Sequence, residues 1–481
     1  PPHSQAPTLP SSHAPELPSP HAPMPTFTVR SSIDHSAEAV FDWHAREGAF
    51  QRLVPPWAPV QLESFEGIED GDRAVLRVGP GPLALTWVAE HHDGIPGRQF
   101  CDRQVQGPFA HWDHTHRFEP DGDAPGDRST LVDHIDYELP GGLLGTAAEP
   151  FLEAELERQF GYRHRVTHRD LALHERYNPE GRSLTVAVSG SSGLVGSALC
   201  AFLSTGGHHV KRIVRSNPSG DDEILWNART NTVETEKLEG VDAVVHLAGE
   251  NVFGLWTDAK KRRIRRSRTD GTRLLAEALA ALDDPPEVLV SASAIGYYGD
   301  HGADEITEDT EPRNAGFLGW VCREWEAAAT PAREAGIRVV HPRIGIVLTP
   351  AGGALQLMLP AFWLGLGGRI GNADQYFSWI ALDDVLGGLY HALWTEEVEG
   401  PMNLTAPEPV TMQTYAKTLA GRLNRPAFFN VPAGVARTLG GEMAEDMLLQ
   451  SARVRPTKLT GTGYTHGTPA LDDALHHLLG R

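Results

Sequence analysis

Cysteine is scarce in this sequence of 481 residues. The three cysteines, Cys101, Cys200 and Cys322, lie far apart and show no spacing that is typical of a metal site or a disulfide framework. Free thiols are typical of proteins in reducing compartments. The sequence therefore predicts a cytoplasmic protein.

Long apolar runs and an excess of positive charge are also absent. No apolar run approaches the roughly 20 residues that a membrane-spanning helix needs. No signal peptide is visible, although a sequence that begins at Pro1 leaves a removed leader open. Lys and Arg number 42 against 63 Asp and Glu, a formal net charge of -21. Because this charge repels phosphate backbones and anionic lipids, we expect no nucleic-acid partner and no membrane partner.

The length of the chain is sufficient for two or three domains. Residues 1–25 contain nine prolines and almost no apolar side chains, which predicts a disordered tail. Residues 26–177 have mostly strand patterns, and residues 178–183 are turn formers that predict a linker. In residues 184–481 strands alternate with helices, which is typical of a parallel sheet with crossover helices.

The pattern over residues 26–177 is a strand, a short helix, several strands and a long final helix, in which Leu152, Leu156 and Phe160 recur at helical spacing. This order resembles the START-like polyketide cyclase/dehydrase superfamily. The resemblance implies an α+β helix-grip domain, in which the sheet grips the long helix and an apolar cavity lies between them. It also implies that this domain binds an apolar ligand.

Three histidines within this unit, His111, His114 and His116, raise the question of a metal site. Side chains alternate along a strand, so His114 and His116 share one face and His111 points to the other. No third ligand for that face is evident from the sequence. We therefore expect no metal, and histidines that line the cavity or form hydrogen bonds.

Residues 190–196 read Gly-Ser-Ser-Gly-Leu-Val-Gly, after an apolar run and before a helical pattern. Glycine permits the sharp turn, the close approach of a pyrophosphate and the packing of helix on strand. The helix N-terminus then presents free N–H groups and a positive dipole to the phosphates. The spacing of Gly190, Gly193 and Gly196 in this context predicts dinucleotide binding.

The identity of the dinucleotide depends on the end of the second strand, residues 209–214. Arg215 stands there, 19 positions after Gly196, where an acidic residue would bind the ribose hydroxyls of NAD. An Arg favours the 2′-phosphate of NADP. Arg212 is a second candidate cation, but it lies inside the strand. We expect NADP, with NAD as the less favoured alternative.

The glycine spacing, residues 246–249 (His-Leu-Ala-Gly) and residues 291–299 (Ser-Ala-Ser-Ala-Ile-Gly-Tyr-Tyr-Gly) together resemble the extended short-chain dehydrogenase/reductase superfamily. Further segments resemble the atypical epimerase-family branch of this superfamily: residues 248–251, 267–272, 324–328, 365–368 and 378–380. This branch carries a DUF1731 region and is also described as cell-division-inhibitor-like. The resemblance covers residues 184–481. It implies an α/β fold, a doubly wound NAD(P)-binding Rossmann sheet with a small C-terminal lobe.

The resemblance also implies a set of cofactor-binding residues. Arg215 would bind the 2′-phosphate, and Glu250 and Arg268 would lie close to the cofactor. The pyrophosphate would lie against the glycine turn, and the adenosine and ribose against the following strand end, which gives the set Gly190, Ser192, Gly193, Leu194, Val195, Gly196, Leu247, Ala248 and Gly249.

One feature of the superfamily is missing. Most members pair a Ser or Thr with Tyr-x-x-x-Lys, in which the ammonium lowers the pKa of the phenol for proton transfer. None of the nine tyrosines here has Lys four positions later. The remaining catalytic candidates are Ser293, Tyr297 and Tyr298. If Tyr297 is the aromatic residue that aligns with the superfamily motif, Ser293 occupies the serine position. If Tyr298 is that residue, Ala294 occupies it instead.

Three functions remain open on these observations. The first is an NADP(H)-dependent oxidoreductase that acts on a small, apolar substrate delivered by the N-terminal unit. The second is a nucleoside-diphosphate-sugar epimerase, which normally needs the missing Tyr–Lys pair. The third is a non-catalytic NADP-binding sensor or interaction protein.

Overall fold

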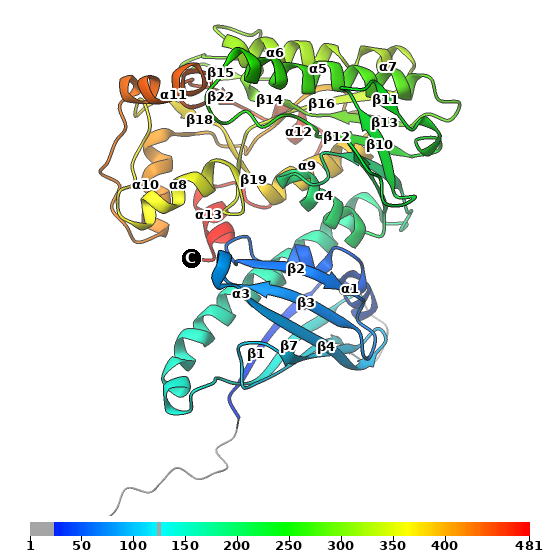
Figure 1. Cartoon of the computed structure of the whole chain (residues 1–481), viewed down its shortest axis with the longest axis vertical. Coiled ribbons are helices and arrows are strands. Elements are labelled where there is room, and N and C mark those ends of the chain that lie inside the picture. The colour runs from blue at the N-terminus through cyan, green and yellow to red at the C-terminus, as the bar shows by residue number, and fades with distance from the viewer. Residues whose placement is uncertain (1–23, 123–126) are drawn as a thin grey trace, which may run out of the picture.

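The computed structural model describes residues 24–122 and 127–481, which form two units, one above the other in Figure 1. The predicted disordered tail, residues 1–25, lies outside the described residues apart from its last two. The first unit is blue to cyan in Figure 1, and the second is green to red. No helix in the described part of the chain combines the length and the apolar character needed to cross a membrane.

The N-terminal unit is built on a seven-stranded antiparallel sheet in the order β1-β7-β6-β5-β4-β3-β2. Its strands are β1 (Thr26–Ile33), β2 (Val60–Phe65), β3 (Arg73–Val78), β4 (Leu85–Ile95), β5 (Gln99–Gln106), β6 (His111–Pro120) and β7 (Ser129–Glu138). Its helices are α1 (Ala37–Ala45), α2 (Ala49–Leu53), the short 3₁₀ helix η1 (Gly81–Leu83) and α3 (Leu143–Tyr177).

Helix α3 packs across this sheet and supplies much of its core. Phe160 and Leu156 meet aromatic and apolar side chains of β1, β6 and β7, while Tyr162 and Val166 pack with residues of α1. This arrangement confirms the predicted helix-grip fold. Strands β2 and β5 were not predicted; in β5 the adjacent Phe100 and Cys101 are both buried, which breaks the alternation of a half-buried strand.

The second unit contains a mainly parallel sheet in the order β11-β10-β9-β8-β12-β13-β16, extended by β14 and β20 beside β16. Its strands are β8 (Thr185–Ser189), β9 (His209–Val214), β10 (Glu223–Asn227), β11 (Thr232–Val233), β12 (Ala243–His246), β13 (Val288–Ser291), β14 (Ser293–Ala294), β16 (Arg338–Ile344) and β20 (Gly400–Leu404). The predicted linker lies between the end of α3 and the start of β8.

Helices cover both faces of this sheet. Val186 and Val188 of β8 pack against α4 (Leu194–Thr205) and α9 (Leu382–Trp394), whereas Ala187 between them faces α5 (Asp258–Ala280). This alternation within one fully buried strand confirms the predicted doubly wound sheet. Two further helices lie on the α5 side, α6 (Gly316–Ala327) and α7 (Thr330–Glu334).

The chain completes a small C-terminal lobe after β16. Its helices are α8 (Gly353–Trp363), α10 (Met412–Arg422), α11 (Ala433–Leu448), α12 (Thr457–Gly461) and α13 (Leu471–Leu479). Helix α11 consists of two helices joined at Gly441, where φ is +56°. Short elements complete the list: β15 (Glu305–Ile306), β17 (Ile346–Leu348), β18 (Tyr376–Phe377), β19 (Trp379–Ala381), β21 (Val410–Thr411), β22 (Arg453–Val454), η2 (Thr235–Lys237) and η3 (Ile295–Tyr297).

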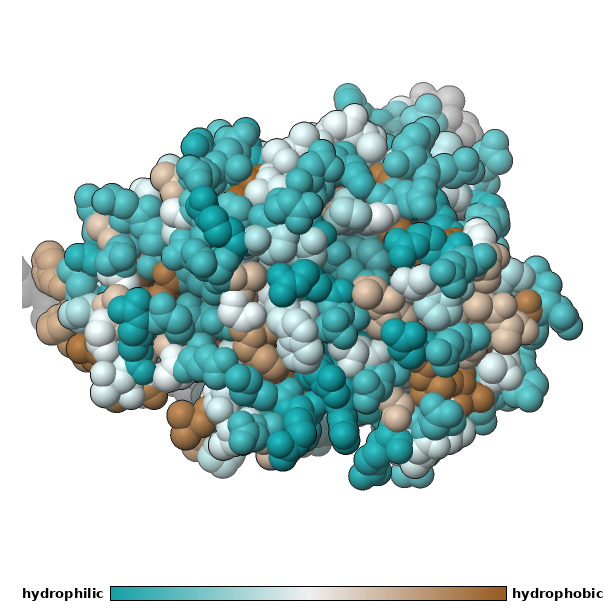
Figure 2. Space-filling view, turned by 90° about the horizontal axis from the view of Figure 1, so that it is seen from above, coloured by the Kyte–Doolittle hydropathy of each residue, from teal (hydrophilic) through white to brown (hydrophobic). Residues whose placement is uncertain are grey.

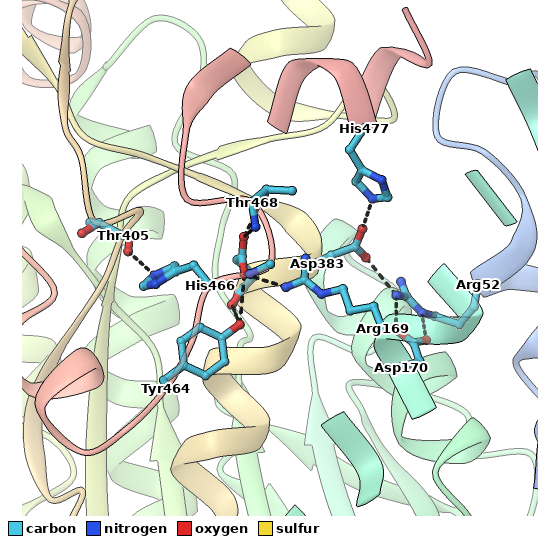
Figure 3. Close-up of polar contacts among 11 residues, drawn as sticks. Arg52, Arg169, Asp170, Asp383, Thr405, Tyr464, His466, Thr468 and His477 are labelled. Atoms are coloured by element: carbon cyan, nitrogen blue, oxygen red, sulfur yellow. Dashed lines mark hydrogen bonds and ion pairs between the residues drawn. The ribbon is translucent and has the colours of Figure 1, made fainter. Parts of the chain in front are cut away.

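Buried ion pairs join the two units (Figure 3). Arg52 of α2 donates to Asp170 of α3 at 2.7 Å and lies 2.9 Å from Asp383 of α9. Asp383 also lies 2.7 Å from Nε2 of His477 in α13. Because all four side chains are less than one-tenth exposed, these charges depend on one another for compensation.

A second ion pair extends this contact along α3. Arg169 pairs with Asp384, whose carboxylate also accepts the N–H groups of Gly467 at 2.8 Å and Thr468 at 3.1 Å (Figure 3). The last turns of α3, the start of α9 and the C-terminal segment therefore form one polar contact. Helix α3 belongs structurally to both units.

Candidate cofactor and active site

The glycine turn after β8 is closed too tightly for side chains. At Gly190 φ is +69°, and a Cβ there would lie 2.9 Å from the carbonyl carbon of Leu247. A Cβ on Gly196 would lie 2.1 Å from the carbonyl oxygen of Gly190. The turn itself is held by a 2.8 Å hydrogen bond from Gly193 N–H to Gly190. Two glycines are therefore required by packing alone.

The N-terminus of α4 is available to an anion. Helix α4 begins at Leu194, and its N-cap residue, Gly193, provides no side-chain cap. The first N–H groups of a helix have no partner within the helix, so those of Leu194, Val195 and Gly196 point toward the turn. Ser192 and Gly193 are exposed beside them. A pyrophosphate fits this combination of free N–H groups and positive dipole.

The segment after β12 is held next to this turn by Ser189. The Ser189 hydroxyl oxygen accepts the N–H groups of Leu247 at 3.1 Å and Ala248 at 3.2 Å, and lies 2.7 Å from Nδ1 of His246. Strands β9 and β10 lie on one side of β8, and β12 and β13 on the other. The turn and residues 247–249 thus meet where the strand order reverses, which is where doubly wound sheets bind ligands.

Arg215 follows directly after β9 and is exposed. Within the described residues, no carboxylate lies within 4.0 Å of its guanidinium, whereas Arg212 lies 3.8 Å from Glu47. The carbonyl group of Arg215 accepts a hydrogen bond from the side-chain amide of Asn227 at 3.1 Å. Its guanidinium is therefore available to bind a phosphate.

Glu250 and Arg268 shape the neighbouring backbone. Hydrogen bonds from Lys260 and Arg263 to the Glu250 carboxylate lower its pKa, so Glu250 has no proton to donate near neutral pH. Arg268 donates to the Glu250 carbonyl at 3.0 Å and lies against Gly249. Lys260 and Arg263 of α5 are thus paired with Glu250. Figure 2, seen from the side of α5 and α6, shows a mostly hydrophilic surface.

The catalytic candidate Ser293 belongs to a network that the sequence did not predict. Its hydroxyl donates to Glu326 of α6 at 2.6 Å. Arg343, at the end of β16, donates to both oxygens of Glu326 at 2.9 Å, a two-point charge-assisted contact. The residues come from three separate elements, but Glu326 lies within the 324–328 segment, which carries part of the family resemblance. Its position in this segment is the sequence signal that could have identified Glu326.

The two tyrosine candidates have different environments. Tyr298 is fully buried, donates to Asn403 at 2.6 Å and accepts from Arg343 at 2.9 Å. Burial raises the pKa of Tyr298 to about 12. Tyr297 is half-buried, and the Arg343 guanidinium lies over its ring at 3.5 Å from the centroid. The structure thus brings Ser293, Tyr297 and Tyr298 together around Arg343.

Helix α6 carries no tyrosine or lysine. Its Cys322 is buried, which raises the pKa of the thiol to about 12 and leaves it protonated. Trp325 donates to the Thr272 hydroxyl at 2.9 Å, a packing contact with α5. Glu326 is the titratable side chain of α6 that contacts Ser293.

The fold and the glycine turn define a dinucleotide-binding α/β protein with a preceding helix-grip domain. Three family models match the chain: polyketide cyclase/dehydrase and lipid transport over residues 33–160, the NAD-dependent epimerase/dehydratase family over residues 186–401, and the domain of unknown function DUF1731 over residues 431–478. Epimerase family protein Mb2239 of Mycobacterium bovis is 40% identical over 291 residues, 60% of this chain and 96% of the relative. The chain therefore belongs to the epimerase family of NAD-dependent epimerase/dehydratase proteins.

Two solved structures are also similar. The crystal structure of human epimerase family protein SDR39U1 with NADPH is 34% identical with a TM-score of 0.57, and the match covers 61% of this chain and 99% of that one. The crystal structure of the nucleoside-diphosphate sugar epimerase from Corynebacterium glutamicum is 32% identical with a TM-score of 0.78 and covers 94% and 90%. The second match therefore extends over both units.

Proposed function

We propose that this protein is an NADP(H)-dependent oxidoreductase of an atypical short-chain type that acts on a small, apolar substrate. The observation that carries the proposal is the exposed Arg215 guanidinium at the carboxyl end of β9, which has no carboxylate within 4.0 Å in the described part of the chain. A site that selects NADP(H) suits an enzyme that uses this dinucleotide as an exchangeable redox cosubstrate. The related human structure with NADPH supports this choice.

Bound NADPH would supply the hydride, and the chain would handle the proton. Ser293 is placed to hydrogen-bond a substrate oxygen, because its hydroxyl can rotate between that oxygen and Glu326. In alcohol oxidation the substrate proton would pass to the Ser293 oxygen as the Ser293 proton passes to the Glu326 carboxylate. In carbonyl reduction Glu326 would first take up a proton from solvent and the relay would run in reverse, with Arg343 holding the carboxyl group in position. Tyr297 forms a wall of the site, and the buried Tyr298 anchors Arg343.

An apolar substrate is favoured by the contact between the two units. A cavity of about 310 Å³ lies between α2 and the start of α4, lined largely by apolar side chains that include Phe50, Pro55, Leu194 and Leu382. Leu194 is also a predicted cofactor residue, so this cavity adjoins the glycine turn. The match of the first unit to the polyketide cyclase and lipid transport model supports an apolar ligand.

The second candidate is a nucleoside-diphosphate-sugar epimerase, favoured by the description of the Corynebacterium glutamicum structure. Epimerisation by transient oxidation needs a group that removes and returns a proton, and the usual Tyr–Lys pair is missing. Such an enzyme also keeps its cofactor bound through the whole catalytic cycle, whereas a site selective for NADP(H) suits a cofactor that is exchanged. We rank this function below net oxidoreduction for both reasons.

Incubation of the full chain with NADPH and a panel of apolar carbonyl compounds and nucleotide sugars tests the proposal. We expect consumption of NADPH with an apolar carbonyl, lost in Ser293→Ala but with NADPH binding retained. Release of tightly held NAD on denaturation, with conversion of a nucleotide sugar, would support the epimerase instead. Silence across the panel with NADPH bound would favour the non-catalytic sensor.

A further inference from the structure

Histidine and aspartate side chains from three neighbouring strands meet in the first unit. Asp102 of β5 pairs with His114 of β6, and His116 pairs with Asp133 of β7. Directly paired residues share a face of the sheet, as do His114 and His116 two positions apart. The third ligand that the sequence of β6 lacked therefore comes from β5, a strand that the alternation pattern did not reveal.

We propose that Asp102, His114 and His116 bind a divalent transition-metal ion. One oxygen of Asp102, Oδ2, lies 3.4 Å from Nδ1 of His114 and 3.2 Å from Nε2 of His116, and the three ligand atoms lie within 4.8 Å of one another. Ligand atoms at about 2.1 Å from a metal are about 3.0–3.4 Å apart in octahedral or tetrahedral geometry. The distances from Asp102 Oδ2 to both histidine nitrogens therefore match those between ligand atoms of a bound ion.

Asp133 orients both histidine ligands from the opposite side. Its Oδ1 lies 2.9 Å from Nε2 of His114 and 2.8 Å from Nδ1 of His116. Each ring therefore directs one nitrogen toward Asp102 and the other toward Asp133. Metal-binding histidines commonly donate their second N–H to a carboxylate in this way.

His164 of α3 in turn fixes Asp133. Its Nε2 lies 2.6 Å from Asp133 Oδ2, and its Nδ1 lies 2.6 Å from the Ser31 hydroxyl of β1. The side chains of Asp133 and His164 are each 5% exposed. The supporting layer is thus buried and joins the sheet to the long helix.

Charge and exposure at the cluster suit a bound cation with one open coordination position. Asp102 and Asp133 place two carboxylates within one histidine cluster, where a bound divalent ion would offset part of their negative charge. The ligand side chains of Asp102 and His116 remain 17% and 11% exposed, so one side of the ion would face outward. Two nitrogens and one oxygen with an open position favour Zn²⁺ or Fe²⁺ that also binds water or a ligand oxygen.

Metal content and titration of the full, untagged chain test this site. After treatment with a chelator and dialysis, we expect one equivalent of Zn²⁺ to bind by calorimetry and one of Co²⁺ to give visible d–d absorption bands. Asp102→Asn and His116→Gln should each weaken Zn²⁺ binding at least tenfold and abolish the Co²⁺ bands. His111→Gln, on the opposite face of the same strand, should change neither.

NADPH binding and the far-ultraviolet circular dichroism of each variant report whether the chain is folded. This readout does not depend on the proposed metal. Less than one-tenth of an equivalent bound to the wild-type chain would overturn the proposal, and the cluster would then be a hydrogen-bonded network. Full stoichiometric binding by both ligand variants, or an equal loss in His111→Gln, would also overturn it.

Discussion

At the scale of single residues, Gly196 offers the sharpest test of the cofactor turn. Its added Cβ in Gly196→Ala would lie 2.1 Å from the Gly190 carbonyl oxygen, a backbone atom that cannot rotate away. We expect the turn to open and NADPH binding to weaken at least tenfold, about 1.4 kcal/mol. Calorimetric titration measures this loss. Gly421→Ala, where an added Cβ meets nothing within 4 Å, is the matched control and should bind as the wild type does.

Arg215 decides the choice between NADP and NAD. In Arg215→Ala, loss of charge-assisted hydrogen bonds to the 2′-phosphate should cost about 1.5–3 kcal/mol in NADPH binding. The affinity for NADH, which lacks that phosphate, should change little. Fluorescence titration with both nucleotides gives the two dissociation constants. Equal weakening would contradict the assignment, and Arg212→Ala tests the neighbouring cation in the same way.

At the scale of elements, the ion pairs between α2, α3 and α9 make a prediction about stability. Asp383→Asn removes the charge that Arg52 and His477 share in a buried site. Breaking a buried pair on one side leaves an uncompensated charge, and we expect the free energy of unfolding to fall by about 3 kcal/mol.

Urea denaturation monitored by tryptophan fluorescence measures this change. Asp34→Asn is the matched control, because Asp34 and Arg128 form a pair in which both side chains are more than 60% exposed. Its effect should be much smaller than that of Asp383→Asn, because solvent screens an exposed pair. Similar decreases in the free energy of unfolding of the two variants would contradict the larger contribution that we expect from the buried interdomain pairs.

The elements also show how far local pattern extends. The alternation of Trp112, His114 and His116 in β6 predicted which histidines share a face, and their burial confirms it. Strand β5 lacked such alternation, so Asp102 was missed. The 324–328 segment was recognised from the family resemblance, whereas the contacts of its Glu326 with Ser293 and Arg343 involve residues of other elements.

At the scale of the whole molecule, buried neutral histidines predict a dependence of stability on pH. Burial lowers the pKa of His44, His208, His246 and His391 to about 4. In an unfolded chain the histidine pKa is about 6.5. Between these values the unfolded state takes up protons that the folded state does not, so stability is full above pH 6.5 and falls as the pH drops toward 4.

Each such histidine contributes a slope of up to about 1.4 kcal/mol per pH unit in this window. Urea denaturation at several pH values between 7.5 and 4.5 measures the combined slope. His208 accepts the Leu184 N–H at Nδ1 and bonds Tyr390 at Nε2, so its neutral form is built into the fold. His208→Gln should reduce the slope whatever its effect at pH 7.5. A constant free energy of unfolding across the range would contradict this account.

The sequence by itself determined the features whose physics is local. The glycine turn depends on residues that lack a Cβ and lie within seven consecutive positions. The periods of strands and helices likewise indicate which side chains are buried. The two folds and the cofactor class followed from these patterns. Only the tertiary structure decided the partners of Ser293, the third side chain beside His114 and His116, and the charges between the two units. These contacts join residues tens to hundreds of positions apart, and pairing across strands and domains leaves no local period in the chain.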